Sequence, residues 1–349
     1  MTLSLPDLLA GIILAALTAY VLLAGADFGG GVWDLLASGP PPRRARQRDL
    51  IAHAIGPVWE ANHVWLILAV VLLFTCFPPA FARVAIALHV PLTLVLIGIV
   101  LRGSAFTFRS YGGDREEEKH WGQVFAVASL VTPILLGVAV GAVASGAAGE
   151  QGAGSGGQFY EAYVAPWLKP FPFAVGLFAL ACFAFLAAVY LTLEARDRDL
   201  QEDFRLRAIG AGVAVFVTAA LGLLLSHQAS FVGRGLVGAP WAVTLHVLTG
   251  GAAVTAFWAL WTRRYRAARV AAAAQVTLIL WGWGLAQYPY LLPPDLTIAA
   301  AAAPRVTLQL ALGAVSVGAI VLFPSLYYLL RVFKRPSSAP PTTPPIPPR

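Results

Sequence analysis

Two carboxylates stand inside long apolar stretches of this sequence, where a charged group is costly. Asp27 lies in the segment Ala-Gly-Ala-Asp-Phe-Gly-Gly-Gly, and Glu60 lies in Gly-Pro-Val-Trp-Glu-Ala-Asn-His-Val-Trp. An ionisable side chain at the centre of a membrane helix costs about 2.5–3.5 kcal/mol to insert, so it is a candidate for function. Because carboxylates bind and release protons, both acids are candidates for a proton path.

Histidines accompany the second acid at helical spacing. The residues that follow one another at intervals of three or four are His53, Gly56, Glu60 and His63. On a continuous helix they would share one face. A row of imidazoles and carboxylates could carry protons from the membrane surface to its middle. A polar cluster that only holds helices together would have the same spacing, so the sequence leaves both interpretations open.

Two arginines bound the segment Arg-Gly-Ser-Ala-Phe-Thr-Phe-Arg, which runs from Arg102 to Arg109. Arg102 lies close enough to the expected membrane boundary to pair with a buried acid, although anchoring at the membrane surface would also explain both arginines. Asp34 is nearer the boundary than Asp27, and we expect it to reach water. The glycines around Asp27 permit close approach either by a neighbouring helix or by a bound group.

The composition of the chain identifies the medium in which these residues work. Of 349 residues, 58% are hydrophobic and only 12% are charged, and the mean hydropathy is +0.74. Soluble domains carry about a quarter charged residues. The chain is therefore predicted to be an all-α integral membrane protein. Its net charge of +7 reflects short basic clusters between apolar stretches, so we expect no nucleic acid as a partner.

Nine apolar stretches approach the length of roughly 20 residues that a membrane-spanning helix needs. They cover about 8–36, 51–76, 80–104, 122–146, 168–194, 206–226, 240–262, 269–287 and 306–332. The eighth is short, so eight spans are an alternative. Asp27 and Glu60 each stand about ten residues from a helix end, which places both roughly 15 Å from the same membrane surface.

Basic residues orient these spans. With nine spans, all 24 Lys and Arg lie on one side of the membrane except Arg83, Lys169, Arg234 and Arg305. Because cytoplasmic loops carry an excess of Lys and Arg, the N-terminus is predicted outside and the C-terminus in the cytoplasm. The first stretch lacks a basic leader and a cleavage signal, so we expect a retained helix.

Other groups carry weaker signals. Cys76 and Cys182 stand alone in apolar stretches, and we expect them to be buried small hydrophobic side chains; we predict no metal site. His89 and His246 both fall in the outer half of their spans and could be a pair of haem ligands. A histidine that only makes a packing hydrogen bond would have the same position.

The order of these features along the chain suggests four regions. Residues 1–147 form an N-terminal helical bundle with the acid and arginine motifs, and 148–167 form a Gly-rich loop on the outer side. Residues 168–333 form a C-terminal helical bundle, and 334–349 form a disordered Pro-rich tail.

Several of these motifs resemble subunit II of the cytochrome bd quinol oxidase family. The segments that carry the resemblance are Gly25–Gly29, Gly56–Trp65, Arg102–Arg109, Trp281–Gly284 and Ala286–Tyr290. They follow the order expected of that family and span nearly the whole chain. The resemblance implies two four-helix bundles plus one peripheral helix in the cytoplasmic membrane of a bacterium or archaeon. It further implies a heterodimer whose subunit I carries haems b and d and the quinol site.

The resemblance also implies roles for particular residues. Acids matching Asp27 and Glu60 belong to a proton route in the family. By their spacing with Glu60, His53 and His63 would extend that route, and the supporting residues would be Trp59, Asn62, Arg102 and Arg109. Thr107 stands where many relatives carry an acid. This chain would bind no haem, although a structural quinone and a small single-helix subunit occur in the family. A secondary transporter, or a b-type cytochrome that binds its own haem, are the alternatives.

Overall fold

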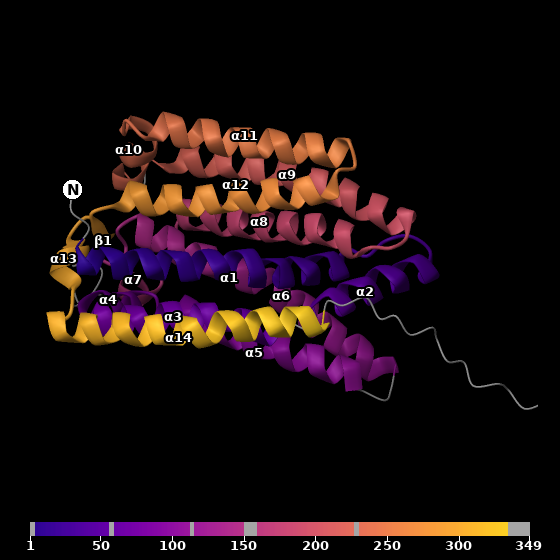
Figure 1. Ribbon diagram of the computed structural model, residues 1–349, viewed down its shortest axis with the longest axis horizontal. Helices are drawn as coiled ribbons and strands as arrows, with labels where there is room; N and C mark the ends of the chain where they lie inside the picture. Colours follow the sequence, from indigo (N-terminus) through magenta and orange to yellow (C-terminus); the bar gives the residue numbers. More distant parts are fainter. Residues whose placement is uncertain (1–3, 56–58, 112–114, 150–158, 227–229, 334–349) are drawn as a thin grey trace, which may run out of the picture.

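The computed structural model describes residues 4–55, 59–111, 115–149, 159–226 and 230–333. These residues form long helices and one two-stranded antiparallel sheet (Figure 1). The elements are α1 (Leu5–Leu35), α2 (Pro41–Ile55), α3 (Trp59–Cys76), α4 (Pro78–Ala87), α5 (His89–Tyr111), α6 (Arg115–Ala144), α7 (Phe159–Tyr163), α8 (Pro170–Glu194), α9 (Arg198–Leu225), α10 (Ser230–Gly238), α11 (Ala242–Trp261), α12 (Tyr265–Gln287), β1 (Tyr290–Leu292), β2 (Leu296–Thr297), α13 (Ile298–Ala301) and α14 (Arg305–Phe333).

Among the described residues, eight helices are long and apolar enough to cross a membrane, namely α1, α5, α6, α8, α9, α11, α12 and α14. A ninth span passes the same test only when α3 and α4 are taken together, and these two helices are bent by 117° relative to one another. The prediction of an all-α membrane protein with about nine spans is therefore confirmed.

The predicted boundaries of the third span are wrong, whereas the second span ends at Cys76 as predicted. The second predicted span, 51–76, contains the end of α2, to Ile55, and α3, from Trp59; residues 56–58 lie outside the described residues. Instead of one helix over 80–104, the short helix α4 precedes α5, which continues to Tyr111. Pro78 at the first position of α4 explains the bend after α3, because proline starts a helix well but cannot continue the preceding one.

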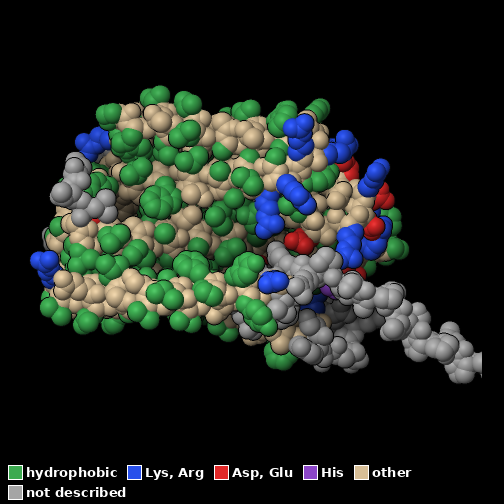
Figure 2. All heavy atoms as spheres, viewed as in Figure 1, with side chains coloured by type: hydrophobic (Ala, Val, Ile, Leu, Met, Phe, Trp, Pro, Cys, Tyr) green, Lys and Arg blue, Asp and Glu red, His purple; other side chains and the backbone are tan. Residues whose placement is uncertain are grey.

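One end of the molecule, here called the basic end, contains α2 and the turns from α8 to α9 and from α11 to α12 (Figure 1). Lys and Arg side chains gather there (Figure 2). At this end α2 is tied to α9, since Arg43 Nε donates to Asp203 at 3.0 Å and Gln47 Nε2 donates to it at 2.8 Å. The hydrogen bond to Asp203 raises the pKa of the Arg43 guanidinium above its ordinary value.

The long helices form two groups that share a wide contact. Helices α1, α3, α5 and α6 pack together, as do α8, α9, α11 and α12. Helix α8 contacts α1 and α6 as well as its own group, and it is the most buried of the candidate spans. Helix α14 lies at the periphery along α3 and α1 (Figure 1). Only 6% of its most apolar 18-residue stretch is buried.

The region predicted as a Gly-rich loop, 148–167, contains the short helix α7 (Phe159–Tyr163) at the end opposite the basic end (Figure 1). Residues 150–158 of that loop lie outside the described residues, as does the predicted tail, 334–349. The hairpin of β1 and β2, together with α13, lies at the same end and connects α12 to α14.

Glycines explain how the two groups of helices approach so closely. A Cβ on Gly29 of α1 would overlap the main-chain carbonyl of Phe183 in α8. Gly137 of α6 and Gly176 of α8 face one another in the same way. Small residues permit such close approach of helix backbones in membranes. Of the two interpretations of the glycines near Asp27, helix packing therefore describes Gly29.

We expect Gly29→Ala to lower the thermal stability of the purified protein. The added Cβ meets a backbone carbonyl, which cannot move without moving α8, and overpacking of this kind costs about 1–3 kcal/mol. The melting temperature in detergent measures the effect. Gly11→Ala is the matched control, because nothing lies within 4 Å of a Cβ at that position of the same helix. Equal melting temperatures for the two variants would contradict the prediction.

Candidate functional site

Asp27 lies in the interior of the first helical group, which consists of α1, α3, α5 and α6, and a residue of α3 holds it there. Its residue is 4% exposed, and its carboxylate oxygen Oδ2 accepts a hydrogen bond from Asn62 Nδ2 at 2.6 Å. Asn62 itself is buried. The amide occupies one carboxylate oxygen and leaves Oδ1 able to accept a proton. The structure thus brings together two of the predicted residues, which are 35 positions apart in the sequence and lie on different helices.

Arg102 of α5 supplies a positive charge beside this acid. It is only 2% exposed, and its guanidinium lies over the rings of Phe28 at 4.8 Å and Phe125 at 5.2 Å. Cation–π contacts of this kind stabilise a desolvated guanidinium. Arg102 Nε and Nη2 make no hydrogen bond to any described residue, and the ring of Phe28 that Arg102 covers directly follows Asp27 in α1. The arginine is therefore a buried counter-charge and not only a membrane anchor.

Glu60 and Trp59 begin α3, directly before Asn62. Their side chains lie outside the described residues. The backbone of Glu60 is two residues from Asn62, which amounts to about 3 Å along the helix axis. Glu60 thus begins α3 close to the level of Asp27, and the role of its side chain stays a prediction.

The two predicted histidines lie in different surroundings. His63 of α3 is partly buried, with ring centroids 5.9 Å from Tyr20 and 6.2 Å from Phe28. His53 belongs to α2, is exposed, and its Nδ1 lies 2.8 Å from the carbonyl oxygen of Asp49. The predicted shared face assumed one helix through both residues. Residues 56–58 between them lie outside the described residues; because His53 is exposed and His63 contacts Tyr20 and Phe28, only His63 joins the Asp27 cluster.

The surroundings of Asp34 differ from those that the sequence predicted. We expected it to reach water, but its side chain is only 6% exposed and both carboxylate oxygens accept from Arg109 Nη1 at 3.1 Å. Arg48 of α2 lies close, with Nε 3.9 Å from Asp34 Oδ1. Position along the sequence indicated nearness to the membrane surface but could not indicate that α5 and α2 cover the last turn of α1. Arg109, predicted as a supporting residue, therefore pairs with Asp34.

Thr107 takes no part in either acid cluster. It is exposed, and its hydroxyl donates to the carbonyl of Gly103 in the same helix at 3.1 Å. A hydroxyl bonded to its own helix satisfies itself locally. In this chain the carboxylate beside Arg109 comes from Asp34 of α1.

Sequence reasoning missed residues that complete the cluster. Tyr20 is 2% exposed and its hydroxyl makes no hydrogen bond to a described residue. Phe28 and Phe125 hold the guanidinium of Arg102. Tyr20 stands seven residues before Asp27, which predicts the same side of a helix, but an aromatic residue in an apolar stretch gives no other signal. The assembled group can hold a carboxylate in the membrane interior and exchange a proton at it.

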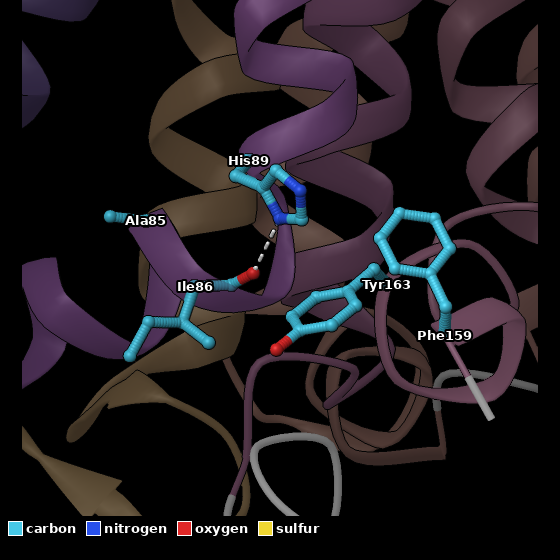
Figure 3. Close-up of a pocket in the computed structure, with 5 residues that line it drawn as sticks. All are labelled: Ala85, Ile86, His89, Phe159 and Tyr163. Carbon is cyan, nitrogen blue, oxygen red and sulfur yellow. Dashed lines mark hydrogen bonds between the residues drawn. The ribbon is translucent and has the colours of Figure 1, made fainter. Parts of the chain in front are cut away.

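The two possible haem ligands are not brought together. His89 begins α5, beside a pocket of about 460 Å³ lined by Ala85, Ile86, Phe159 and Tyr163 (Figure 3). Its Nδ1 lies 3.1 Å from the carbonyl oxygen of Ile86, and Tyr163 meets it edge-on at 4.8 Å. His246 lies on α11, on the far side of α8 and α1 from α5 (Figure 1), and its Nδ1 lies 2.6 Å from the carbonyl oxygen of Ala242.

The two cysteines are buried in apolar surroundings, as expected. Cys182 belongs to the large core around α8, and Cys76 belongs to the core at the end opposite the basic end. Among the described residues, no group of three or more His, Cys, Asp or Glu is placed to hold a metal ion.

Comparison with known proteins decides the family. A sequence profile described as "Cytochrome bd terminal oxidase subunit II" matches residues 5–333. The chain belongs to this family. The resemblance carried by the acid and arginine motifs is thereby confirmed, and the chain is a multi-pass protein of the cytoplasmic membrane.

Individual members of the cytochrome bd subunit II family are similar to this chain over different lengths. "Cytochrome bd ubiquinol oxidase subunit 2" of Bacillus subtilis is 32% identical over 135 residues, which is 39% of each chain. "Putative cytochrome bd menaquinol oxidase subunit II" of the same organism is 22% identical over 327 residues, or 90% of this chain and 92% of that one. "Cytochrome bd-I ubiquinol oxidase subunit 2" of Escherichia coli is 29% identical over 40% of this chain and 35% of its own length.

A solved structure shares the fold. The chain in "The structure of bd oxidase from Geobacillus thermodenitrificans" aligns with a TM-score of 0.78 over 95% of this chain and 98% of that chain, at 24% sequence identity. The arrangement of helices described above is thus an arrangement found in a bd oxidase.

Proposed function

We propose that this chain is the haem-free subunit II of a quinol:dioxygen oxidoreductase, and that it stabilises a haem-bearing subunit I and supplies a cytoplasmic proton path for the reduction of dioxygen to water. The observation that carries the proposal is the buried Asp27, bonded to Asn62, with the buried guanidinium of Arg102 over the adjacent ring of Phe28. All three residues lie in the motifs that first suggested the family. The names of the relatives support the same complex.

The geometry of the cluster suits repeated proton exchange. Asn62 fixes one oxygen of Asp27, so the other can bind and release a proton in a constant orientation. Arg102 offsets the negative charge that remains after release, which makes the anion tolerable in the membrane interior. If the basic end faces the cytoplasm, as the positive-inside rule indicates, protons would reach Asp27 along the last two turns of α1.

The haems would belong to the partner subunit. His89 and His246 each bond a carbonyl near their own helix start and lie on opposite sides of the molecule, which supports a chain without a bis-histidine haem site. Spanning helices such as α9, α11 and α14 expose large apolar side chains, and lipid together with subunit I would cover them. The haems would supply the electron transfer and dioxygen chemistry of the complex.

The visible absorption spectrum of the purified chain tests this function. We expect haem absorbance when subunit I co-purifies and none when this chain is purified alone. Haem bound to the isolated chain would overturn the proposal in favour of a b-type cytochrome. Purification without any haem-bearing partner would overturn it in favour of a transporter with buried acids.

A further inference from the structure

The two buried acids of α1 form a matched pair with the two arginines of α5. Asp27 and Asp34 are seven residues apart, as are Arg102 and Arg109. Seven residues are close to two turns, so each pair lies on one side of its helix and spans about 10.5 Å. Both helices run toward the basic end (Figure 1). Arg102 lies over the ring of Phe28, the residue after Asp27, and Arg109 bonds Asp34, so the two levels are in register.

Glycines occupy the positions between the two acids on this side of α1. These positions are three and four residues after Asp27, and they hold Gly30 and Gly31. A Cβ at Gly30 would meet the side chain of Ile55, whereas a Cβ at Gly31 would overlap the hydroxyl of Ser129 in α6. The absence of a side chain at Gly31 therefore lets a hydroxyl from another helix lie against α1 between the acids.

The hydroxyl of Ser129 is buried without a hydrogen bond to a described residue, as are those of Tyr20 and Thr132. Ser129 is 0% exposed, and its Oγ has no hydrogen-bond partner among the described residues. Ser226, directly after α9, and Ser316, on α14, instead donate to a carbonyl of the adjoining or own helix. A buried polar group without a partner costs about 1–3 kcal/mol, so such a group calls for an explanation.

We propose that Asp34 and Ser129 form the intake leg of the proton path, leading from the basic end to Asp27. This inference rests on the proposed function and extends it. Asp34 accepts a proton at the basic end, and the Ser129 hydroxyl takes up that proton while it gives its own proton toward Asp27. One proton enters and one leaves, so the hydroxyl is unchanged after each transfer.

The distances along α1 define what this leg needs. Gly31, where Ser129 touches the helix, lies about 4.5 Å from the level of Asp34 and about 6 Å from the level of Asp27 along the axis. Each interval is longer than one hydrogen bond, so water must bridge both. Arg109 holds Asp34 through one nitrogen only, which leaves lone pairs on both oxygens for water. Arg109 is thus the positioning residue for Asp34.

Turnover of the intact oxidase complex with quinol and dioxygen tests the intake leg. We expect Asp34→Asn to lower turnover at least about tenfold with the haem absorbance unchanged, and Asp34→Glu to restore part of it. Ser129→Ala should lower turnover several-fold and increase the ratio of rates in H₂O and D₂O. A purely structural ion pair would not change that ratio.

Matched variants separate the outcomes. Asp197→Asn is the control for Asp34→Asn, because it alters another acid at the basic end that is paired with Arg46 but 58% exposed. Thr192→Val is the control for Ser129→Ala, because it removes another fully buried hydroxyl. Both controls should keep normal turnover. Normal turnover of Asp34→Asn, or its loss together with the haem absorbance, overturns the intake leg. Asp27→Asn distinguishes the two proposals: if it also turns over normally, the proposed proton path fails, and if it alone is slow, only the intake leg fails.

Discussion

Asp27→Asn is expected to slow the reduction of dioxygen by the intact complex about 10²-fold, at the low end of what a positioned proton-transferring group contributes. Asparagine has nearly the shape of aspartate and keeps an oxygen that can accept from Asn62 Nδ2. It cannot bind and release a proton. Arg102 keeps its position between two aromatic rings, so we expect assembly and haem absorbance to remain. Oxygen consumption with excess quinol measures the effect.

Two outcomes would contradict this prediction. Normal oxygen consumption by Asp27→Asn would mean that the carboxylate is only a packing group, and that protons reach the haems elsewhere. Loss of haem absorbance would mean that the charge of Asp27 holds the first helical group together. Asn62→Ala provides the intermediate case: it keeps the carboxylate but removes its hydrogen bond, so a smaller loss of turnover is expected.

Arg102→Ala is expected to have the largest effect on assembly. The guanidinium fills the space between Phe28 and Phe125 and is 2% exposed. Its removal leaves a cavity, which costs about 2–5 kcal/mol for a large buried side chain, and removes cation–π contacts that are worth about 2 kcal/mol when desolvated. We expect little intact complex after purification in detergent, measured by size-exclusion chromatography with haem detection.

Arg102→Met separates packing from charge. Methionine fills a comparable space and packs well against aromatic rings, so we expect it to restore much of the complex. It has no charge to offset the Asp27 anion, so turnover should stay low. Equal losses of complex for the methionine and alanine variants would show that charge, and not packing, holds α5 in place. Normal turnover of the methionine variant would exclude Arg102 from the proton path.

The cluster around Asp27 was largely predictable because membrane helices make polar residues conspicuous. Asp27, Asn62 and Arg102 each interrupt an apolar stretch, and their motifs suggested a common site before their contacts were known. Phe125 and Ser129 could not be found in this way. Aromatic and hydroxyl side chains are common in spanning helices, and only the packing of α6 gives these two a role, Phe125 against α5 and Ser129 against α1.

The errors in the prediction arise where the chain changes direction. Hydropathy placed a break between 76 and 80, but it could not indicate that α4 is a short helix bent by 117° from α3 or that the spanning helix α5 begins only at His89. Asp34 was placed correctly near the end of its helix, but its burial depends on Arg109 and Arg48, which come from other helices. Position along an axis follows from counting residues, whereas the choice of facing neighbours is a property of the whole fold.

The central position of α8 constrains how the protein is made. Synthesis from the N-terminus delivers Asp27, Asn62 and Arg102 to the membrane about 70 residues before α8 leaves the ribosome, at about 5–20 residues per second. During those seconds the surface of α1 that later receives Phe183 and Ala184 is open, and the charged groups are already in lipid. Insertion of α8 closes that surface. A chain released before Pro170 would therefore remain in the membrane as an incomplete helical bundle, open to degradation by membrane proteases.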